Sequence, residues 1–162
     1  MNESFGPPQG ETSIALLAWK APVRIFNPMT QVAHSCRGSA CETHGILVTV
    51  EPRYLPSHSD PATGRYLFNY RIEIVNNGSE RVRLRSRRWT IVDADGERHE
   101  VQGMGVVGHN PVLGPGEKFE YSSFAPLQTQ WGTMEGAYVM QREDGSTFEV
   151  SVQRFYLVRP HQ

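Results

Sequence analysis

The chain has 162 residues, of which 38% are hydrophobic and 20% are charged, and its formal net charge is −1. These values predict one domain with a hydrophobic core and exclude a strong overall attraction to nucleic acids or anionic membranes. The two cysteines exclude the disulfide framework of a small secreted domain, and no apolar run approaches the roughly 20 residues of a membrane span, so we expect a cytoplasmic protein.

The first 44 residues differ in composition from the rest of the chain. Prolines interrupt them, and apolar residues are concentrated only between Ile14 and Trp19. We therefore interpret residues 1–44 as a weakly ordered N-terminal arm with one short helix near Thr12–Lys20. Met29 lies within this arm and is an alternative candidate for the start of translation.

From Gly45 onward, hydrophobic residues recur at every second position, which is typical of a strand with one buried face. The clearest example covers residues 66–74, where the even-numbered side chains are apolar. Turn sequences follow at Asn76-Asn77-Gly78, Asp95-Gly96 and Asp144-Gly145, and each is of the type that joins neighbouring strands in a hairpin. Seven or eight such strands without an amphipathic helix predict one all-β domain, an antiparallel β-sandwich, over residues 45–162.

One strand contains an irregularity. Val82 and Leu84 place its apolar face on even numbers, whereas Trp89 and Ile91 place it on odd numbers, so a bulge is expected near Ser86–Arg88. Arginines occupy alternate positions on the polar side of this strand, and we expect them to form one row, called the arginine stripe here. The stripe consists of Arg81, Arg83, Arg85 and Arg87.

The segment Gly103–Gly108 spells G-x-G-x-x-G, which in a dinucleotide-binding fold opens a helix whose N-terminus holds a pyrophosphate. Here the prolines and glycines of Pro111–Gly116 prevent such a helix. The motif therefore either forms a turn between strands or presents backbone N–H groups to an anion. The candidate anion site comprises Gly103, Gly105, Gly108 and the arginine stripe.

The arginine stripe allows two interpretations. Guanidinium groups bind phosphates through paired hydrogen bonds, which would extend the anion site. Alternatively, the stripe is a solvated sheet face whose arginines pair with glutamates such as Glu73 or Glu97. Single-stranded nucleic acid is not favoured as a partner, because the aromatic residues fall mostly on apolar faces and not among the arginines.

The order of five motifs in the chain resembles the ApaG domain, and the similarity runs from about Gly45 to Pro160. The motifs are Phe68–Ile72, Ser86–Trp89, Gly103–Gly108, Pro115–Glu117 and Gly132–Gly136. The resemblance implies a β-sandwich of the immunoglobulin or fibronectin type III kind and an interaction module. It also implies a link to cobalt and magnesium tolerance, and some members of the family are suggested to bind pyrophosphate through the glycine motif.

The sequence contains few residue patterns that are typical of an enzyme active site. His99 and His109 flank the glycine motif and would suit a phosphoanhydride hydrolase, but no nucleophile stands in a recognisable setting. We therefore predict that the protein is not an enzyme and has no cofactor. A set of zinc-type ligands in the arm matches no standard finger, and we predict no metal site. The set consists of His34, Cys36, Cys41 and His44.

Trp131 follows a polar stretch and precedes Gly132, so we expect it in a loop. There it either anchors an interface or closes the open end of the sandwich. The sequence thus predicts a cytoplasmic, non-catalytic module that binds an unidentified protein partner and does not enter membranes. The alternative is a protein that binds pyrophosphate or a nucleotide phosphate through the glycine motif and the arginine stripe.

Overall fold

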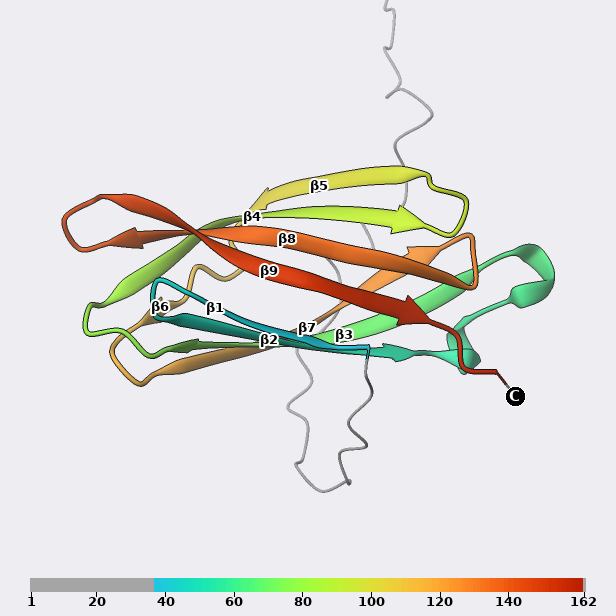
Figure 1. The fold of residues 1–162 in the computed structure, drawn as a ribbon, viewed down its shortest axis with the longest axis horizontal. Helices are drawn as coiled ribbons and strands as arrows, with labels where there is room; N and C mark the ends of the chain where they lie inside the picture. The colour runs from blue at the N-terminus through green and yellow to red at the C-terminus, as the bar shows by residue number, and fades with distance from the viewer. Residues whose placement is uncertain (1–36, 162) are drawn as a thin grey trace, which may run out of the picture.

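The alternating hydrophobic residues build two antiparallel sheets that pack face to face as a β-sandwich, which confirms the predicted fold class (Figure 1). The computed structural model describes residues 37–161. Within these residues no helix has the length and hydropathy that are needed to cross a lipid bilayer.

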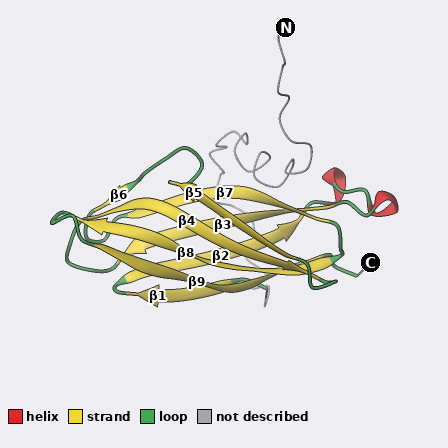
Figure 2. Cartoon of the chain, turned by 90° about the horizontal axis from the view of Figure 1, so that it is seen from above, coloured by secondary structure: helices red, strands yellow, loops and turns green. Residues whose placement is uncertain are grey.

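The first sheet has four strands in the order β1-β2-β3-β7. The bounds are Ser39–Thr43 for β1, Ile46–Tyr54 for β2, Tyr66–Asn76 for β3 and Lys118–Leu127 for β7. Two short 3-10 turns, η1 (Pro56–His58) and η2 (Pro61–Thr63), connect β2 to β3 and project from one end of the sandwich (Figure 2).

The second sheet has five strands, in the order β5-β4-β8-β9 with β6 beside β4. The bounds are Val82–Asp93 for β4, Arg98–Met104 for β5, Val112–Leu113 for β6, Trp131–Arg142 for β8 and Thr147–Val158 for β9. Because Val82 pairs with both Leu113 and Arg142, β6 lies on the opposite edge of β4 from β8 and continues the edge that β5 occupies.

The core lies between the sheets and consists of the inward-facing side chains of both. The alternation predicted for residues 66–74 is observed in β3, where Phe68, Ile72 and Ile74 are fully buried. From the opposite sheet, Tyr138 and Phe155 are equally buried. Ring contacts join the two sheets: Tyr70 of β3 lies 5.9 Å from the ring of Trp89 in β4 and 5.8 Å from that of Phe155 in β9.

The turns after β4 and β8 are the predicted hairpins, but the turn at Asn76-Asn77-Gly78 is not one. It carries the chain from β3 in one sheet to β4 in the other. Its physical basis is the buried amide of Asn76, which donates hydrogen bonds to the carbonyl oxygens of Glu80 (2.7 Å) and Leu113 (2.9 Å). Satisfying a buried amide in this way holds the crossover in place.

The arm predicted for residues 1–44 lies mostly outside the described residues, as do the short helix expected near Thr12–Lys20 and the candidate start at Met29. Its last part, however, is the strand β1, so the sandwich begins before the predicted boundary at Gly45. The strand was not evident because its side chains are small or polar. It is held by pairing with β2, and the Ser39 hydroxyl donates to the carbonyl oxygen of Gln153 in β9 at 2.7 Å.

Candidate functional site

The second half of the glycine motif forms a tight hairpin turn between β5 and β6. Val106 and His109 exchange two backbone hydrogen bonds of 2.8 Å, and between them Val107 and Gly108 have φ values of 48° and 78°. Positive φ at both central positions is the requirement of a type I′ turn, in which glycine fits without strain. The turn interpretation of the motif therefore accounts for Gly108.

Gly105 is required by a close approach of the chain to itself. Its φ is 59°, and a Cβ at this position would overlap the carbonyl oxygen of His109. The N–H of Gly105 donates to the carbonyl oxygen of Arg85 at 2.8 Å, which attaches the turn to β4. Together with Val106 and His109, three N–H groups of this segment are thus occupied by carbonyl acceptors of the protein. Fewer of them remain for an anion than the motif alone suggests.

The bulge in β4 occurs close to the predicted place. The pairing of β4 with β8 shifts between Leu84 and Ser86, so Arg85 is the extra residue. Because an inserted residue reverses the alternation, every side chain after it changes face relative to the pattern before it. The bulge therefore divides the predicted arginine stripe.

Arg87 does not belong to the arginine stripe, which corrects the prediction. In the strand register it lies opposite Tyr138 of β8 and Gly103 of β5. Because residues that lie opposite each other point to the same face of a sheet and Tyr138 is fully buried, the side chain of Arg87 is directed between the sheets. Its guanidinium donates to the carbonyl oxygens of Met104 (3.2 Å) and Gly105 (2.8 Å). A Cβ on Gly103 would lie 3.0 Å from Arg87 Nη1, so this glycine makes room for the guanidinium.

A cavity of about 20 Å³ lies beside Arg87 and is lined among others by Tyr70, Tyr121 and Ser123. This volume suits roughly one water molecule and is too small for a pyrophosphate. Burial raises the pKa of Tyr70, and it raises those of Tyr121 and Tyr138 strongly. The hydroxyls of Tyr121 and Tyr138 are hydrogen-bonded to each other at 2.5 Å. These tyrosines therefore stay protonated at neutral pH.

The other arginines of the stripe lie at the outer face of the five-stranded sheet. Arg81 is 3.9 Å from Glu143, a residue that the sequence analysis did not consider as its partner. The suggested partners lie elsewhere: Glu73 pairs with Lys118 in the other sheet, and Glu97 lies 3.8 Å from His99. Among residues 37–161, no carboxylate lies within ion-pair distance of Arg83 or Arg85.

The same outer face carries the large apolar side chains that are exposed in the described part of the chain. They are Met104, Val112, Trp131 and Tyr156, with exposed fractions of 63%, 39%, 47% and 44%. Tyr156 points outward because its neighbours Phe155 and Leu157 are fully buried. Trp131 begins β8 and does not lie in a loop, and it points away from the core because Gly132 beside it faces inward.

Met104, Val112 and Tyr156 are not among the residues predicted from the sequence, although the alternation around Tyr156 indicates an outward-facing tyrosine. Met104 pairs with Ser86, and Val112 pairs with Arg83. These two apolar residues therefore lie at the bulge end of the sheet, whereas Trp131 and Tyr156 lie at the opposite end. No sequence pattern showed that Met104 and Val112 share one face, because the glycine turn separates them.

A shallow depression of about 460 Å³ lies between these two ends. Arg88, Thr90 and Ser151 contribute to its lining, together with an ion pair in which Arg154 donates to both carboxylate oxygens of Glu135 at 3.0 and 3.1 Å. The middle of this outer face is thus polar, and its charges are paired.

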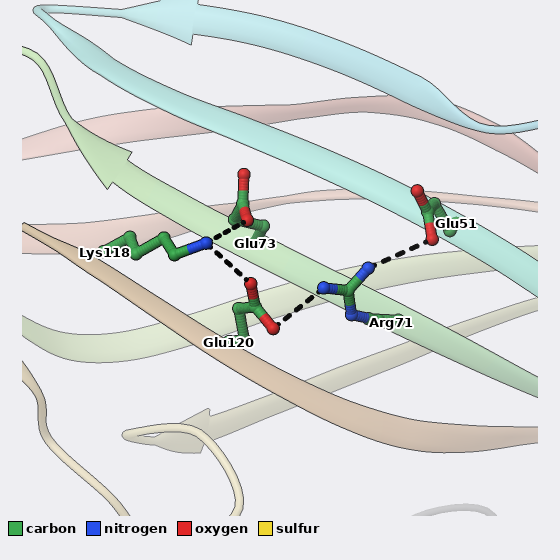
Figure 3. Close-up of polar contacts among 5 residues, drawn as sticks. All are labelled: Glu51, Arg71, Glu73, Lys118 and Glu120. Atoms are coloured by element: carbon green, nitrogen blue, oxygen red, sulfur yellow. Dashed lines mark hydrogen bonds and ion pairs between the residues drawn. The ribbon is translucent and has the colours of Figure 1, made fainter. Parts of the chain in front are cut away.

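The outer face of the four-stranded sheet carries an ion network and no exposed apolar side chain of comparable size among the described residues (Figure 3). Arg71 donates to Glu51 (3.3 Å) and Glu120 (2.8 Å), and Lys118 donates to Glu73 and Glu120 (3.1 Å each). The hydrogen bond from Arg71 is the main cause that lowers the pKa of Glu120 to about 2. The five charges of this network are directed at one another.

No metal centre is assembled in the part of the chain that the structure covers. Within residues 37–161, no three side chains of the metal-binding types gather closely enough to hold an ion. Of the four zinc-type residues, His34 and Cys36 lie outside the described residues, Cys41 is a free thiol, and His44 packs edge-on against Phe148.

The two histidines that flank the glycine motif contact different neighbours. His99 lies 3.8 Å from Glu97, and His109 packs against Phe119 with ring centroids 6.1 Å apart. Neither ring has a hydroxyl or thiol partner among the residues described.

Comparison with known proteins agrees with the resemblance in the motifs. The ApaG domain family matches residues 56–142. Protein ApaG from Methylobacterium sp. (strain 4-46) is 54% identical over 120 residues, which cover 74% of this chain and 92% of that protein. Protein ApaG from Brucella canis is 52% identical over the same length. A crystal structure of a protein from Bordetella pertussis, described as ApaA, has a TM-score of 0.70 and 45% identity, covering 72% of this chain and 95% of that chain.

Proposed function

This chain belongs to the ApaG family, and we propose that it is a non-catalytic, cytoplasmic module that binds a protein partner through the outer face of its five-stranded sheet. One observation carries the proposal: all four large exposed apolar side chains of the described residues lie on this face. They form two groups at opposite ends of the face, Trp131 with Tyr156 and Met104 with Val112, and exposed apolar side chains that lie together on a surface mark interaction sites.

Trp131 and Tyr156 supply the aromatic anchors of the proposed interface. Across β8 and β9, Trp131 pairs with Val158 and Thr133 pairs with Tyr156, so the two rings are diagonal neighbours on adjacent strands. Tryptophan and tyrosine are enriched among the residues that contribute most to binding energy at interfaces. The half-buried Val158 extends the apolar surface next to them.

Photo-crosslinking in cells tests this proposal. A benzophenone side chain is placed at position 131 or 156, and as a matched control at position 122, because Ser122 is exposed on the outer face of the four-stranded sheet. We expect positions 131 and 156 to capture the same protein and position 122 not to capture it. Capture from position 122 alone, or no capture from positions 131 and 156, contradicts the proposal.

Binding of pyrophosphate or a nucleotide phosphate is the second candidate, and one observation favours it. Arg83 and Arg85 have no carboxylate partner among residues 37–161. The backbone carbonyl oxygen of Arg85 accepts a hydrogen bond from the N–H of Gly105 in the glycine motif. The revised site contains Arg83 and Arg85 but not Arg87. The family's link to cobalt and magnesium tolerance stays a separate expectation, to which no described residue is assigned.

Calorimetric titration with pyrophosphate and with a dinucleoside polyphosphate tests the second candidate. We expect heat of binding for the wild type, its loss in Arg85→Glu, and its retention in Arg81→Glu, because Arg81 already has Glu143 as a partner. The absence of heat for the wild type with both ligands rejects this candidate.

A further inference from the structure

We propose that the partner contributes an acidic segment, which docks at the basic end of the outer face of the five-stranded sheet. The basic end consists of Arg83, Arg85, Met104 and Val112. This inference rests on the proposed function and states the chemistry of the partner that the face recognises.

The strand register brings the four residues of the basic end together. Val112 of β6 lies directly across from Arg83, and Met104 of β5 lies across from Ser86. Leu84 and Arg87 both point inward, so the two residues between them, Arg85 and Ser86, both face outward at the bulge. Two guanidinium groups and two exposed apolar side chains therefore share one end of the sheet.

The charges of this face are uneven. Its strands present five arginines outward, at 83, 85, 88, 98 and 154, and three glutamates, at 100, 135 and 149. Each glutamate is paired, with Arg98 (2.7 Å), Arg154 (3.0 Å) and Arg88 (3.3 Å) respectively. The two positive charges in excess are those of Arg83 and Arg85, both at the basic end.

The opposite outer face has the reverse balance. Its strands present four glutamates, at 42, 51, 73 and 120, and three basic residues, at 53, 71 and 118. Guanidinium groups form their strongest hydrogen bonds with carboxylates and phosphates. Of the two outer faces, the one on the five-stranded sheet is therefore the one that attracts an anionic partner. Met104 and Val112 beside the arginines add an apolar requirement, and methionine adapts to side chains of different shapes.

A protein segment fits this surface better than a single-stranded nucleic acid. A nucleic acid carries a phosphate on every nucleotide, and its backbone would meet Glu100 and Glu135 farther along the face or Glu149 two strands away from Ser86. Its bases would also need aromatic platforms near the arginines. Trp131 is instead ten residues along β8 from Gln141, which pairs with Arg83, a separation of roughly 34 Å at about 3.4 Å per residue.

Selection from a library of random twelve-residue peptides displayed on phage, on the full-length chain, tests the inference. We expect the selected peptides to be enriched in aspartate and glutamate next to aliphatic residues. A synthetic copy of the most enriched peptide is expected to bind about tenfold more weakly to Arg83→Glu, which corresponds to one step of about 1.4 kcal/mol. Arg53→Glu is the matched control, because Arg53 is also an exposed, outward-facing strand residue, and its affinity is expected to be unchanged.

Several results overturn the inference: no selected peptide, no acidic enrichment, an equal loss in Arg53→Glu, or tighter binding of a twelve-residue oligothymidylate than of the peptide. The last result identifies a nucleic-acid surface instead. If benzophenone at position 131 captures a protein while the selected peptides are neutral, the inference fails and the proposed function stands. If acidic peptides bind in an Arg83-dependent manner and position 131 captures nothing, the proposed interface at Trp131 and Tyr156 is rejected and the inferred acidic docking at the basic end is kept.

Discussion

The two outer faces of the sandwich arise from the same alternation of polar and apolar residues, yet they use their charges differently. On the four-stranded sheet, Arg71 and Lys118 bridge three glutamates from neighbouring strands (Figure 3). On the five-stranded sheet, Arg83 and Arg85 have no such partner among residues 37–161, and the exposed apolar side chains lie on the same face. A face whose charges are paired across strands is a solvated surface, whereas unpaired arginines beside apolar groups leave interactions to be made with a partner.

The bulge at Arg85 is the structural origin of this difference. It turns Arg87 into the space between the sheets and leaves Arg85 next to the glycine turn, where no carboxylate among residues 37–161 pairs with it. The four-stranded sheet has a continuous register between β3 and β7, so opposite charges there meet directly.

The largest expected effect comes from removing the glycine turn that supports the basic end. Gly105→Val forces a side chain into the carbonyl oxygen of His109 at a positive φ. We expect a loss of about 3 kcal/mol in the free energy of unfolding, measured by urea denaturation. Gly108→Asn is the control, because nothing lies within 4 Å of a Cβ there and asparagine tolerates positive φ. A loss as large for Gly108→Asn as for Gly105→Val contradicts the explanation.

The aromatic anchors give the next largest effect. Trp131→Ala should weaken binding of the crosslinked partner by about 2 kcal/mol, or roughly thirtyfold, because truncating an interface tryptophan removes most of its contact area. Phe124→Ala on the four-stranded sheet should leave the affinity unchanged. Isothermal titration of the purified partner measures both. Equal weakening by the two variants would mean that binding does not discriminate between the faces.

Removing the centre of the ion network has a smaller effect, on stability and not on binding. Arg71→Ala leaves Glu51 and Glu120 without their bridge, and we expect a loss of about 1 kcal/mol at most, because the network is partly exposed and screened by water. The loss should shrink in 1 M NaCl, as expected for a screened interaction. Arg83→Ala should leave stability unchanged, and a destabilisation similar to that of Arg71→Ala would reveal a partner for Arg83.

The smallest effect is the pH dependence of the same network. The folded-state pKa of Glu120 is lowered to about 2, below the value of about 4.5 of an ordinary glutamate, so its contribution is complete above the higher value and is lost as pH falls toward the lower one. Glu120→Gln should flatten the decline of the urea midpoint between pH 5 and about 2. An unchanged slope would show that other carboxylates dominate acid unfolding.

Much of the fold was predictable because alternation is a local property. The apolar face of residues 66–74 and the parity change between Leu84 and Trp89 are both read from neighbouring positions, and both are observed. The strand β1 and the crossover at Asn76 were not predictable, because they depend on pairing with β2 and on hydrogen bonds to carbonyl groups distant in sequence.

The candidate site was only partly predictable for the same reason. Trp131 was singled out as an interface candidate, but its place at the start of β8 follows from pairing with β9. Arg87 was assigned to the wrong face, because a bulge can be inferred from a parity change while the residue at which it occurs is decided by pairing with β8.

The antiparallel sandwich and the ApaG family could be inferred without coordinates, because strand alternation, turn residues and motif order are local features of the chain. The fold was needed to show which arginines have a carboxylate partner and that Met104, Val112, Trp131 and Tyr156 share one face. These outcomes depend on which strands become neighbours and in what register, and such contacts join residues that lie far apart in the sequence.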